Sequence, residues 1–167
     1  MIRTLTMLCC YGLATLLQQQ ADPFQPVRFM IGSWKGTAEG QSGTGAVERT
    51  YTMVLTGRYI QETNVSVYPK ERHEHISFIS YDSNRKLLVL RQFHQEGFVN
   101  RYVLKPELSS ERKIVFESES FENFDNSWKA RETYEILSPN EFVEIFELAP
   151  PGKPYELYSK NHFKRTK

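Results

Sequence analysis

The sequence predicts an all-β domain, built as an antiparallel up-and-down barrel of about ten strands. Strand-like runs of about seven to eleven residues follow one another with turn residues between them. After the N-terminal region, no segment has the apolar period of a long amphipathic helix. Aromatic residues make up 13% of the chain, which suits strands that pack bulky rings inside a barrel. Closure would remove exposed sheet edges, although strand counting leaves a two-sheet sandwich open.

Length and charge narrow the class of protein. A chain of 167 residues is large enough for one domain with a core, and too short for two comfortable ones. The formal net charge of +1 offers no field that would capture nucleic acid or an anionic membrane. We therefore expect no nucleic-acid partner, and the oligomeric state is left open.

Residues 1–21 have the layout of a secretory signal peptide. Arg3 precedes an apolar run over 5–17, and a polar stretch then ends at Ala21, a plausible cleavage edge. The run is too short for a comfortable membrane span. We expect export to the periplasm or the medium, with no stable membrane span once the segment is removed; a retained N-terminal anchor is the alternative.

After cleavage at Ala21, the mature protein would consist of a short lead-in and one domain. Both cysteines, Cys9 and Cys10, lie in the predicted leader, so the mature protein would have no thiol. Residues 22–31 are predicted as a proline-bearing linker and an apolar lead-in, a short helical turn that plugs one end of the sheet. Residues 32–167 are predicted as a single barrel domain.

The first six strands are separated by glycine-bearing or polar turns. Glycines within residues 32–40 mark sharp bending or close backbone approach. Asp, Ser and Asn favour a tight turn at 81–86, and Gly97 supplies a residue suited to positive φ. Between these turns, Leu and Val occupy both parities, as in a barrel wall. The predicted strands are 32–40, 46–56, 58–68 and the three-strand meander over 76–104, which starts near His73.

The last four strands follow the same pattern. Polar loops over 105–112 and 121–127 and proline-bearing turns over 138–140 and 150–152 separate runs with apolar residues on one parity. The predicted strands are 113–120, 128–137, 141–148 and 155–165.

Histidines offer one metal-binding hypothesis. His73 and His75 lie on the same face of a strand, because side chains alternate with a period of two. This pair can bind zinc if a third ligand converges, and His94 or His162 could be that ligand. Two histidines beside a charged loop are also common as solvated surface.

Charged residues inside the strands offer a second hypothesis. An inward Arg91 or Arg131 would form a buried ion pair or bind a ligand carboxylate, whereas an outward one would be solvated. The same choice applies to Arg101, Glu132 and Glu144.

Trp34 packs in the core or stacks on a planar ligand near the barrel mouth. Tyr158 and His162 could ligate haem iron or act in acid/base chemistry. The sequence has no serine nucleophile elbow, phosphate-binding glycine loop or metalloprotease motif.

Residues 32–40 resemble the G-x-W-x-G-x-G-x-G opening of the nitrobindin-like haem-binding β-barrels, with Ala38 at a family glycine. The runs 90–100 and 130–134 resemble a bacterial branch of that superfamily whose members are mostly of unknown function. The resemblance implies a calycin-like barrel, related in shape to fatty-acid-binding proteins, and a haem cofactor. It places the iron ligand on the last strand, where Tyr158 stands at the position of the family histidine.

We therefore expect an exported barrel that binds a small apolar or planar ligand, with haem as the leading specific candidate. One alternative is a small-molecule enzyme with His94, Tyr158 or His162 as acid/base residues. Another is a filled barrel with a structural or interaction role. The candidate ligand-binding residues are Trp34, Arg91, His94, Arg131, Tyr158 and His162.

Overall fold

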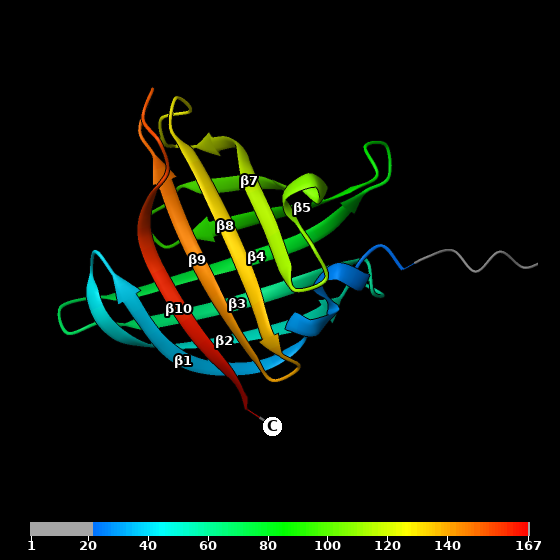
Figure 1. The fold of residues 1–167 in the computed structure, drawn as a ribbon, viewed down its shortest axis with the longest axis horizontal. Coiled ribbons are helices and arrows are strands. Elements are labelled where there is room, and N and C mark those ends of the chain that lie inside the picture. The colour runs from blue at the N-terminus through cyan, green and yellow to red at the C-terminus, as the bar shows by residue number, and fades with distance from the viewer. Residues whose placement is uncertain (1–21, 167) are drawn as a thin grey trace, which may run out of the picture.

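The computed structural model describes residues 22–166, which form a closed barrel of ten antiparallel strands. Each strand pairs with its neighbours in the chain, and β1 pairs with β10 to close the sheet (Figure 1). The predicted all-β up-and-down barrel is confirmed, and the two-sheet sandwich is excluded. The signal peptide predicted over residues 1–21 lies outside the described residues. Within residues 22–166, no helix is long and apolar enough to cross a membrane.

The strands follow the order that the turn residues predict. The first five are β1 (Gly32–Gly40), β2 (Gly43–Val54), β3 (Tyr59–Val67), β4 (Arg72–Asp82) and β5 (Leu87–His94). The last five are β6 (Val99–Leu104), β7 (Lys113–Glu122), β8 (Lys129–Ser138), β9 (Glu141–Ala149) and β10 (Glu156–Thr166). Two short 3₁₀ helices accompany them, η1 (Gln25–Met30) before β1 and η2 (Pro106–Leu108) before β7.

The helical turn η1 packs against one end of the barrel, in blue in Figure 1. Its side chains Val27 and Met30 are fully buried in the core. The indole Nε1 of Trp34 donates a hydrogen bond of 2.6 Å to the carbonyl oxygen of Met30. This helical turn therefore closes one end of the barrel, as predicted for the apolar lead-in within residues 22–31.

The seam between β1 and β10 requires a glycine. A Cβ atom placed on Gly36 would lie 1.9 Å from the carbonyl oxygen of His162, so only a residue without a side chain fits. The backbones of the two strands approach each other closely at this point, which is one reason for a glycine inside a strand.

The barrel interior is apolar in one half and polar in the other. Trp34, Ile60, Leu90 and Phe142 belong to the apolar core that η1 covers. Further along the same strands, charged and amide side chains replace the apolar ones. The buried polar residues include Arg49, Glu62, Asn64, Ser66, Gln92, Glu132 and Glu144.

Strand β3 shows the change of polarity most clearly. Its inward residues are Ile60 and then the polar Glu62, Asn64 and Ser66, whereas Val67 is 47% exposed on the outer face. Apolar parity therefore does not identify the inner face of this strand, because the interior is polar there.

Candidate functional site

A cavity of about 530 Å³ opens within the polar half of the barrel. Its lining includes Gly40 at the end of β1 and His94 at the end of β5, with the turn residues Gln41, Ser42, Gln95 and Glu96 that follow them. Strand β1 begins beside η1 and ends at this cavity, so η1 and the cavity lie at opposite ends of the barrel. A volume in this range is typical of small-molecule sites.

Aromatic side chains form the rim of the cavity. Phe98 lies 6.0 Å from Phe124 between ring centroids, and Phe124 lies 5.9 Å from Trp128. On another side, Tyr158 packs edge-on against Phe146 at 5.4 Å. All five rings line the cavity. The rim therefore offers flat apolar surfaces to a bound molecule.

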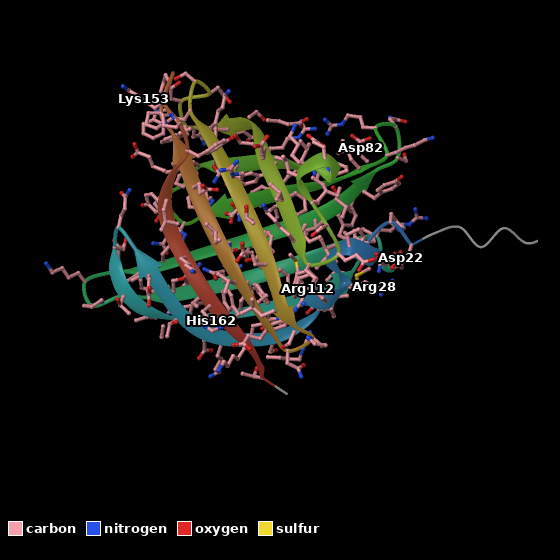
Figure 2. The ribbon with its side chains drawn as sticks, in the orientation of Figure 1. Asp22, Arg28, Asp82, Arg112, Lys153 and His162 are labelled. Atoms are coloured by element: carbon pink, nitrogen blue, oxygen red, sulfur yellow. The ribbon has the colours of Figure 1, made fainter. Side chains whose placement is uncertain are left out.

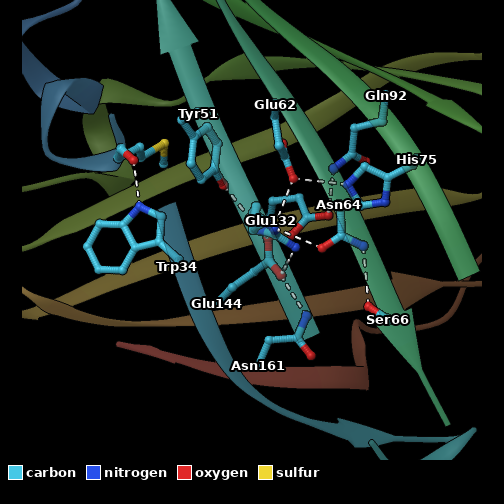
Figure 3. A network of polar contacts seen from close by, with 12 residues as sticks. Trp34, Tyr51, Glu62, Asn64, Ser66, His75, Gln92, Glu132, Glu144 and Asn161 are labelled. Atoms are coloured by element: carbon cyan, nitrogen blue, oxygen red, sulfur yellow. Dashed lines mark hydrogen bonds and ion pairs between the residues drawn. The ribbon is translucent and has the colours of Figure 1, made fainter. Parts of the chain in front are cut away.

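A buried ion-pair network forms the floor (Figure 3). Arg49 of β2 reaches Glu144 of β9 in a two-pronged contact, with Nη1–Oε1 at 2.5 Å and Nη2–Oε2 at 2.9 Å. Arg49 Nε also lies 3.0 Å from Glu62 Oε1 and donates to Asn64 Oδ1 at 3.0 Å. Asn161 of β10 donates to Glu144 at 2.7 Å. Burial opposes the charge of Arg49, but Glu144 and Glu62 outweigh it and raise the guanidinium pKa.

Glu62 connects this network to a histidine. Its Oε1 lies 3.0 Å from Nε2 of His75, whose side chain comes from the neighbouring strand β4. Burial raises the pKa of Glu62, but the charges of Arg49 and then His75 outweigh it and bring the pKa to about 2. A carboxylate accepts hydrogen bonds only, so His75 carries its proton on Nε2.

Glu132 is the acid of the floor that lacks an arginine partner. Its Oε1 lies 3.4 Å from Nε2 of Gln92, and its Oε2 has no hydrogen-bond partner among the described residues. Burial, reinforced by the charge of Glu144, raises the pKa of Glu132 well above its ordinary value. Glu132 therefore favours the neutral acid, which can donate a hydrogen bond into the cavity.

Three histidines meet on the cavity wall. His73 and His75 project from one face of β4, and His94 lies opposite His75 on β5. One ring nitrogen of each lies within 4.8 Å of the other two. The structure thus brings His94 to the pair as the third member of the predicted zinc set, whereas His162 lies on the outer wall against Glu141.

The ring of His94 is held between two neighbours. It stacks on Phe98 with centroids 4.2 Å apart and planes 22° apart. Its Nε2 lies 3.2 Å from the side-chain amide of Asn100. Burial, followed by the charges of His75 and His73, lowers the pKa of His94 to about 3. The ring is therefore a neutral imidazole at neutral pH.

The six residues predicted for ligand binding do not all reach the cavity. His94 and Tyr158 line it. Trp34 is 1% exposed and lies in the apolar half, where the guanidinium of Arg165 covers its ring at 4.1 Å. Its indole nitrogen is already bonded to Met30, so Trp34 acts in the core rather than as a stacking surface.

Arg91, Arg131 and His162 project from the outer wall. Arg91 donates to Ser80 at 3.0 Å, and Arg131 pairs with Glu147 at 2.7 Å. The side chain of His162 is 42% exposed and contacts Glu141 at 2.8 Å (Figure 2). The physical reason is the alternation of β-strands, which turns each of these residues away from its inward neighbours.

Tyr158 and His162 consequently do not converge on one iron atom. The inward residues on either side of His162 are the buried Asn161 and Phe163, so the histidine faces outward. Tyr158 reaches the cavity rim beside a register shift between Leu157 and Ser159.

Sequence reasoning missed Arg49 and Glu62, which hold the floor together. A signal for Arg49 was present, since it shares its parity with Val47 and Tyr51, both of which point inward. A single arginine in an inward apolar row indicates a buried partner. Glu62 gave no such signal, because Ile60 is the only apolar residue on its parity in β3 and Tyr59, Val65 and Val67 lie on the other.

No protein-family model matches the chain, and a search of curated proteins found no match. Among solved structures, the chain is similar to the crystal structure of Rv2717c from M. tuberculosis, with a TM-score of 0.67 and 15% identity over 88% of this chain and 99% of that chain. A second structure, EF1p2_mFAP2b bound to DFHBI, has a TM-score of 0.46 and 9% identity over 87% of this chain and 100% of that chain. The TM-score of the second structure is too low to support an inference. The first shows that the fold is shared with a known barrel.

Proposed function

We propose that this protein is an exported barrel that binds one small molecule with a flat or apolar body and a polar end. The proposal rests on one observation: the lining of the cavity is aromatic at the rim and polar at the floor. Aromatic rings at the rim suit a flat body, and the floor offers the amide of Asn161, the acid Glu132 and the guanidinium of Arg49. The predicted leader supports export.

Haem is the specific ligand to test first, and the resemblance to nitrobindin-like barrels supports this choice. The residues allow one arrangement. Tyr158 lines the cavity rim, and a tyrosine oxygen can ligate ferric haem iron. His162 does not fit, since it lies on the outer wall against Glu141. Tyr158 is therefore the residue that we assign to the iron, with the rim aromatics around the macrocycle.

The other two readings are less well supported by the geometry. A filled barrel leaves no space, whereas this one encloses a cavity of about 530 Å³. For an enzyme, His94 and Tyr158 both line the cavity but His162 does not, so the three candidate acid/base residues do not act at one place.

The test is a titration of the full chain with haemin and, separately, with a fatty acid and a flat uncharged dye. Haemin binding is followed in the Soret region. Every ligand is also followed by tryptophan fluorescence, because Trp128 lies at the rim and Trp34 in the core. We expect saturable binding of at least one ligand, with a fluorescence response that Trp128→Phe removes and Trp34→Phe preserves.

Matched variants locate the site. Tyr158→Phe is expected to shift the Soret band and weaken haemin binding, whereas Tyr81→Phe, on a tyrosine 39% exposed, leaves both unchanged. Phe146→Ala, at the rim, is expected to weaken every ligand, and Phe93→Ala, on a ring 44% exposed, none. Absence of haemin binding with retention of another ligand would remove haem but keep the binding barrel. Failure of all three ligands would overturn the proposal.

A further inference from the structure

We propose that His73, His75 and His94 bind one divalent transition-metal ion, of the class of Zn²⁺, inside the cavity. The inference goes beyond small-molecule binding, because it requires no organic ligand and uses other residues than Tyr158. It depends on the position of the ring nitrogens, on their hydrogen-bond partners and on the charge around them.

The spacing of the ring nitrogens suits a tetrahedral ion. Zinc binds imidazole nitrogen at about 2.0–2.1 Å, and a tetrahedral angle then sets the two nitrogens about 3.4 Å apart. His73 Nε2 and His94 Nδ1 lie 3.4 Å apart. One ring nitrogen of His75 lies within 4.8 Å of one ring nitrogen of each of the other two histidines.

Two of the histidines already have the partner that metal-bound histidines usually have. A ligating imidazole commonly donates its other N–H to a carboxylate, which fixes the ring and its tautomer. His73 Nδ1 lies 2.9 Å from Glu96 Oε1, and His75 Nε2 lies 3.0 Å from Glu62 Oε1. Each contact leaves the opposite nitrogen with a free lone pair, Nε2 in His73 and Nδ1 in His75.

The free nitrogen of His75 is an unpartnered buried atom. His75 is only 9% exposed, and its Nδ1 has no hydrogen-bond partner among residues 22–166. A buried polar atom without a partner costs free energy unless something satisfies it. A metal ion on this nitrogen satisfies it, and the ring lies among the residues that line the cavity.

His94 completes the set with a ring that is already oriented. Phe98 stacks on it at 4.2 Å, and Asn100 lies 3.2 Å from its Nε2. Asn100 Nδ2 faces His94 Nε2 and donates to the hydroxyl of Tyr102 at 3.0 Å. Turning the amide over exchanges Nδ2 for Oδ1, which accepts from His94 Nε2–H and from the Tyr102 hydroxyl. His94 Nδ1 then faces His73 with its lone pair free.

The surroundings favour a cation. Two buried carboxylates, those of Glu62 and Glu144, share the guanidinium of Arg49, and a third buried acid, Glu132, lies beside them. A divalent ion on the histidines compensates this excess of acidic groups at close range. Three imidazoles without a thiolate suit zinc, copper or nickel.

A three-histidine site leaves one coordination position open, and all three histidines line the cavity. Sites with three protein ligands and an open position bind water or a substrate atom at the metal. An ion held here would therefore contact the polar end of a molecule bound in the cavity.

The test is metal titration of the full chain after treatment with a chelator. Cys9 and Cys10 are replaced by serine in every sample, because free thiols would also bind the ion. Zn²⁺ binding is measured by calorimetry, and Co²⁺ binding by its visible absorption, which is strong for four-coordinate sites. We expect one ion per chain, and a rise in melting temperature as ion is added.

The histidines themselves supply the controls. His73→Gln and His94→Gln are expected to weaken Zn²⁺ binding by about 100-fold or more, since loss of an outer partner alone costs about 10–100-fold. Glu96→Gln removes only such a partner, so we expect about 10-fold weakening. His162→Gln, on the outer wall, is the matched control and is expected to leave binding unchanged. Circular dichroism confirms that each variant is folded.

Stoichiometric binding that the cluster variants lose and His162→Gln keeps would support the site. Absence of Zn²⁺ and Co²⁺ binding, or equal loss in His162→Gln, would overturn it. Because no organic ligand is present, this failure is distinct from failure of the small-molecule proposal, which is measured with haemin, a fatty acid and a dye and located at Tyr158 and Phe146.

Discussion

Replacing Arg49 is the most direct test of the buried ion pairs at the cavity floor. Arg49 is 3% exposed, and its guanidinium contacts Glu144, Glu62, Asn64 and Tyr51. Arg49→Met retains much of the side-chain length and removes every polar contact. Two buried carboxylates then lose the only cation paired with them among the arginines and lysines that the structure describes.

The expected cost is about 3–5 kcal/mol of unfolding free energy at pH 7, as for other broken buried ion pairs. Glu62 gives an independent figure. Its pKa falls from 4.5 to about 2 in the folded protein, with Arg49 the largest lowering influence. At about 1.4 kcal/mol per pKa unit, that difference is worth about 3 kcal/mol, part of which belongs to His75.

The sign of the pH dependence follows from the same pKa. A depressed pKa stabilises the folded wild-type protein above pH 4.5, and this contribution is lost as the pH falls toward 2. In Arg49→Met, burial without the arginine raises the pKa of Glu62, so the variant is most penalised at neutral pH. The difference between variant and wild type therefore shrinks on acidification.

The assay is urea denaturation at pH 7 and pH 4, with chelator present, followed by far-ultraviolet circular dichroism. Arg91→Met is the matched control, because Arg91 projects outward and makes one hydrogen bond, to Ser80; we expect a cost below about 1 kcal/mol. Adding Glu62→Gln and Glu144→Gln to Arg49→Met removes the stranded charges and is expected to recover stability. A cost below 1 kcal/mol for Arg49→Met, or an equal cost at both pH values, would refute the reasoning.

Two further predictions concern other positions. Glu132→Gln is expected to raise the unfolding free energy at pH 7 by about 2 kcal/mol. Burial raises the pKa of Glu132, so the wild-type protein loses stability as the pH rises above 4.5. Urea denaturation measures the gain, and Glu135→Gln, on the outer face, should show none. Gly36→Ala is expected to cost about 3 kcal/mol or more, because the new Cβ would meet the carbonyl oxygen of His162. Gly97→Ala meets no atom within 4 Å and should cost about 1–2 kcal/mol from its positive φ alone. Thermal melts in which Gly36→Ala was the milder change would contradict the close approach.

Most of the fold could be predicted from local sequence, because turns and alternation are local properties. Asp82 accepts hydrogen bonds from the backbone N–H groups of Asn84 and Arg85, as turn chemistry predicts. The inner face of β3 could not be predicted in this way. Its outward Val67 is apolar and its inward Glu62 is charged, and that burial is tolerable because Arg49 and His75 of the two neighbouring strands pair with Glu62.

The site was predictable to the extent that it depends on one strand. The shared face of His73 and His75 follows from the period of two. The choice between His94 and His162 does not, because it requires the register that places His94 opposite His75. The same limit applies to Arg91 and Arg131. Whether each side chain points into the barrel or outward depends on which parity of its strand faces the interior, and the local sequence does not determine this.

Glu62 links the ion-pair network of the cavity floor to the histidine cluster, because it contacts both Arg49 and His75. A buried ion pair is weak support for stability, since its desolvation cost can exceed its attraction. The same barrel already has an apolar core in the half that η1 closes. Retaining charges in the other half is therefore better explained by ligand recognition than by folding. A metal ion on His75 would act on Arg49 through Glu62, so ion binding and recognition of an organic ligand are expected to be thermodynamically coupled in either order.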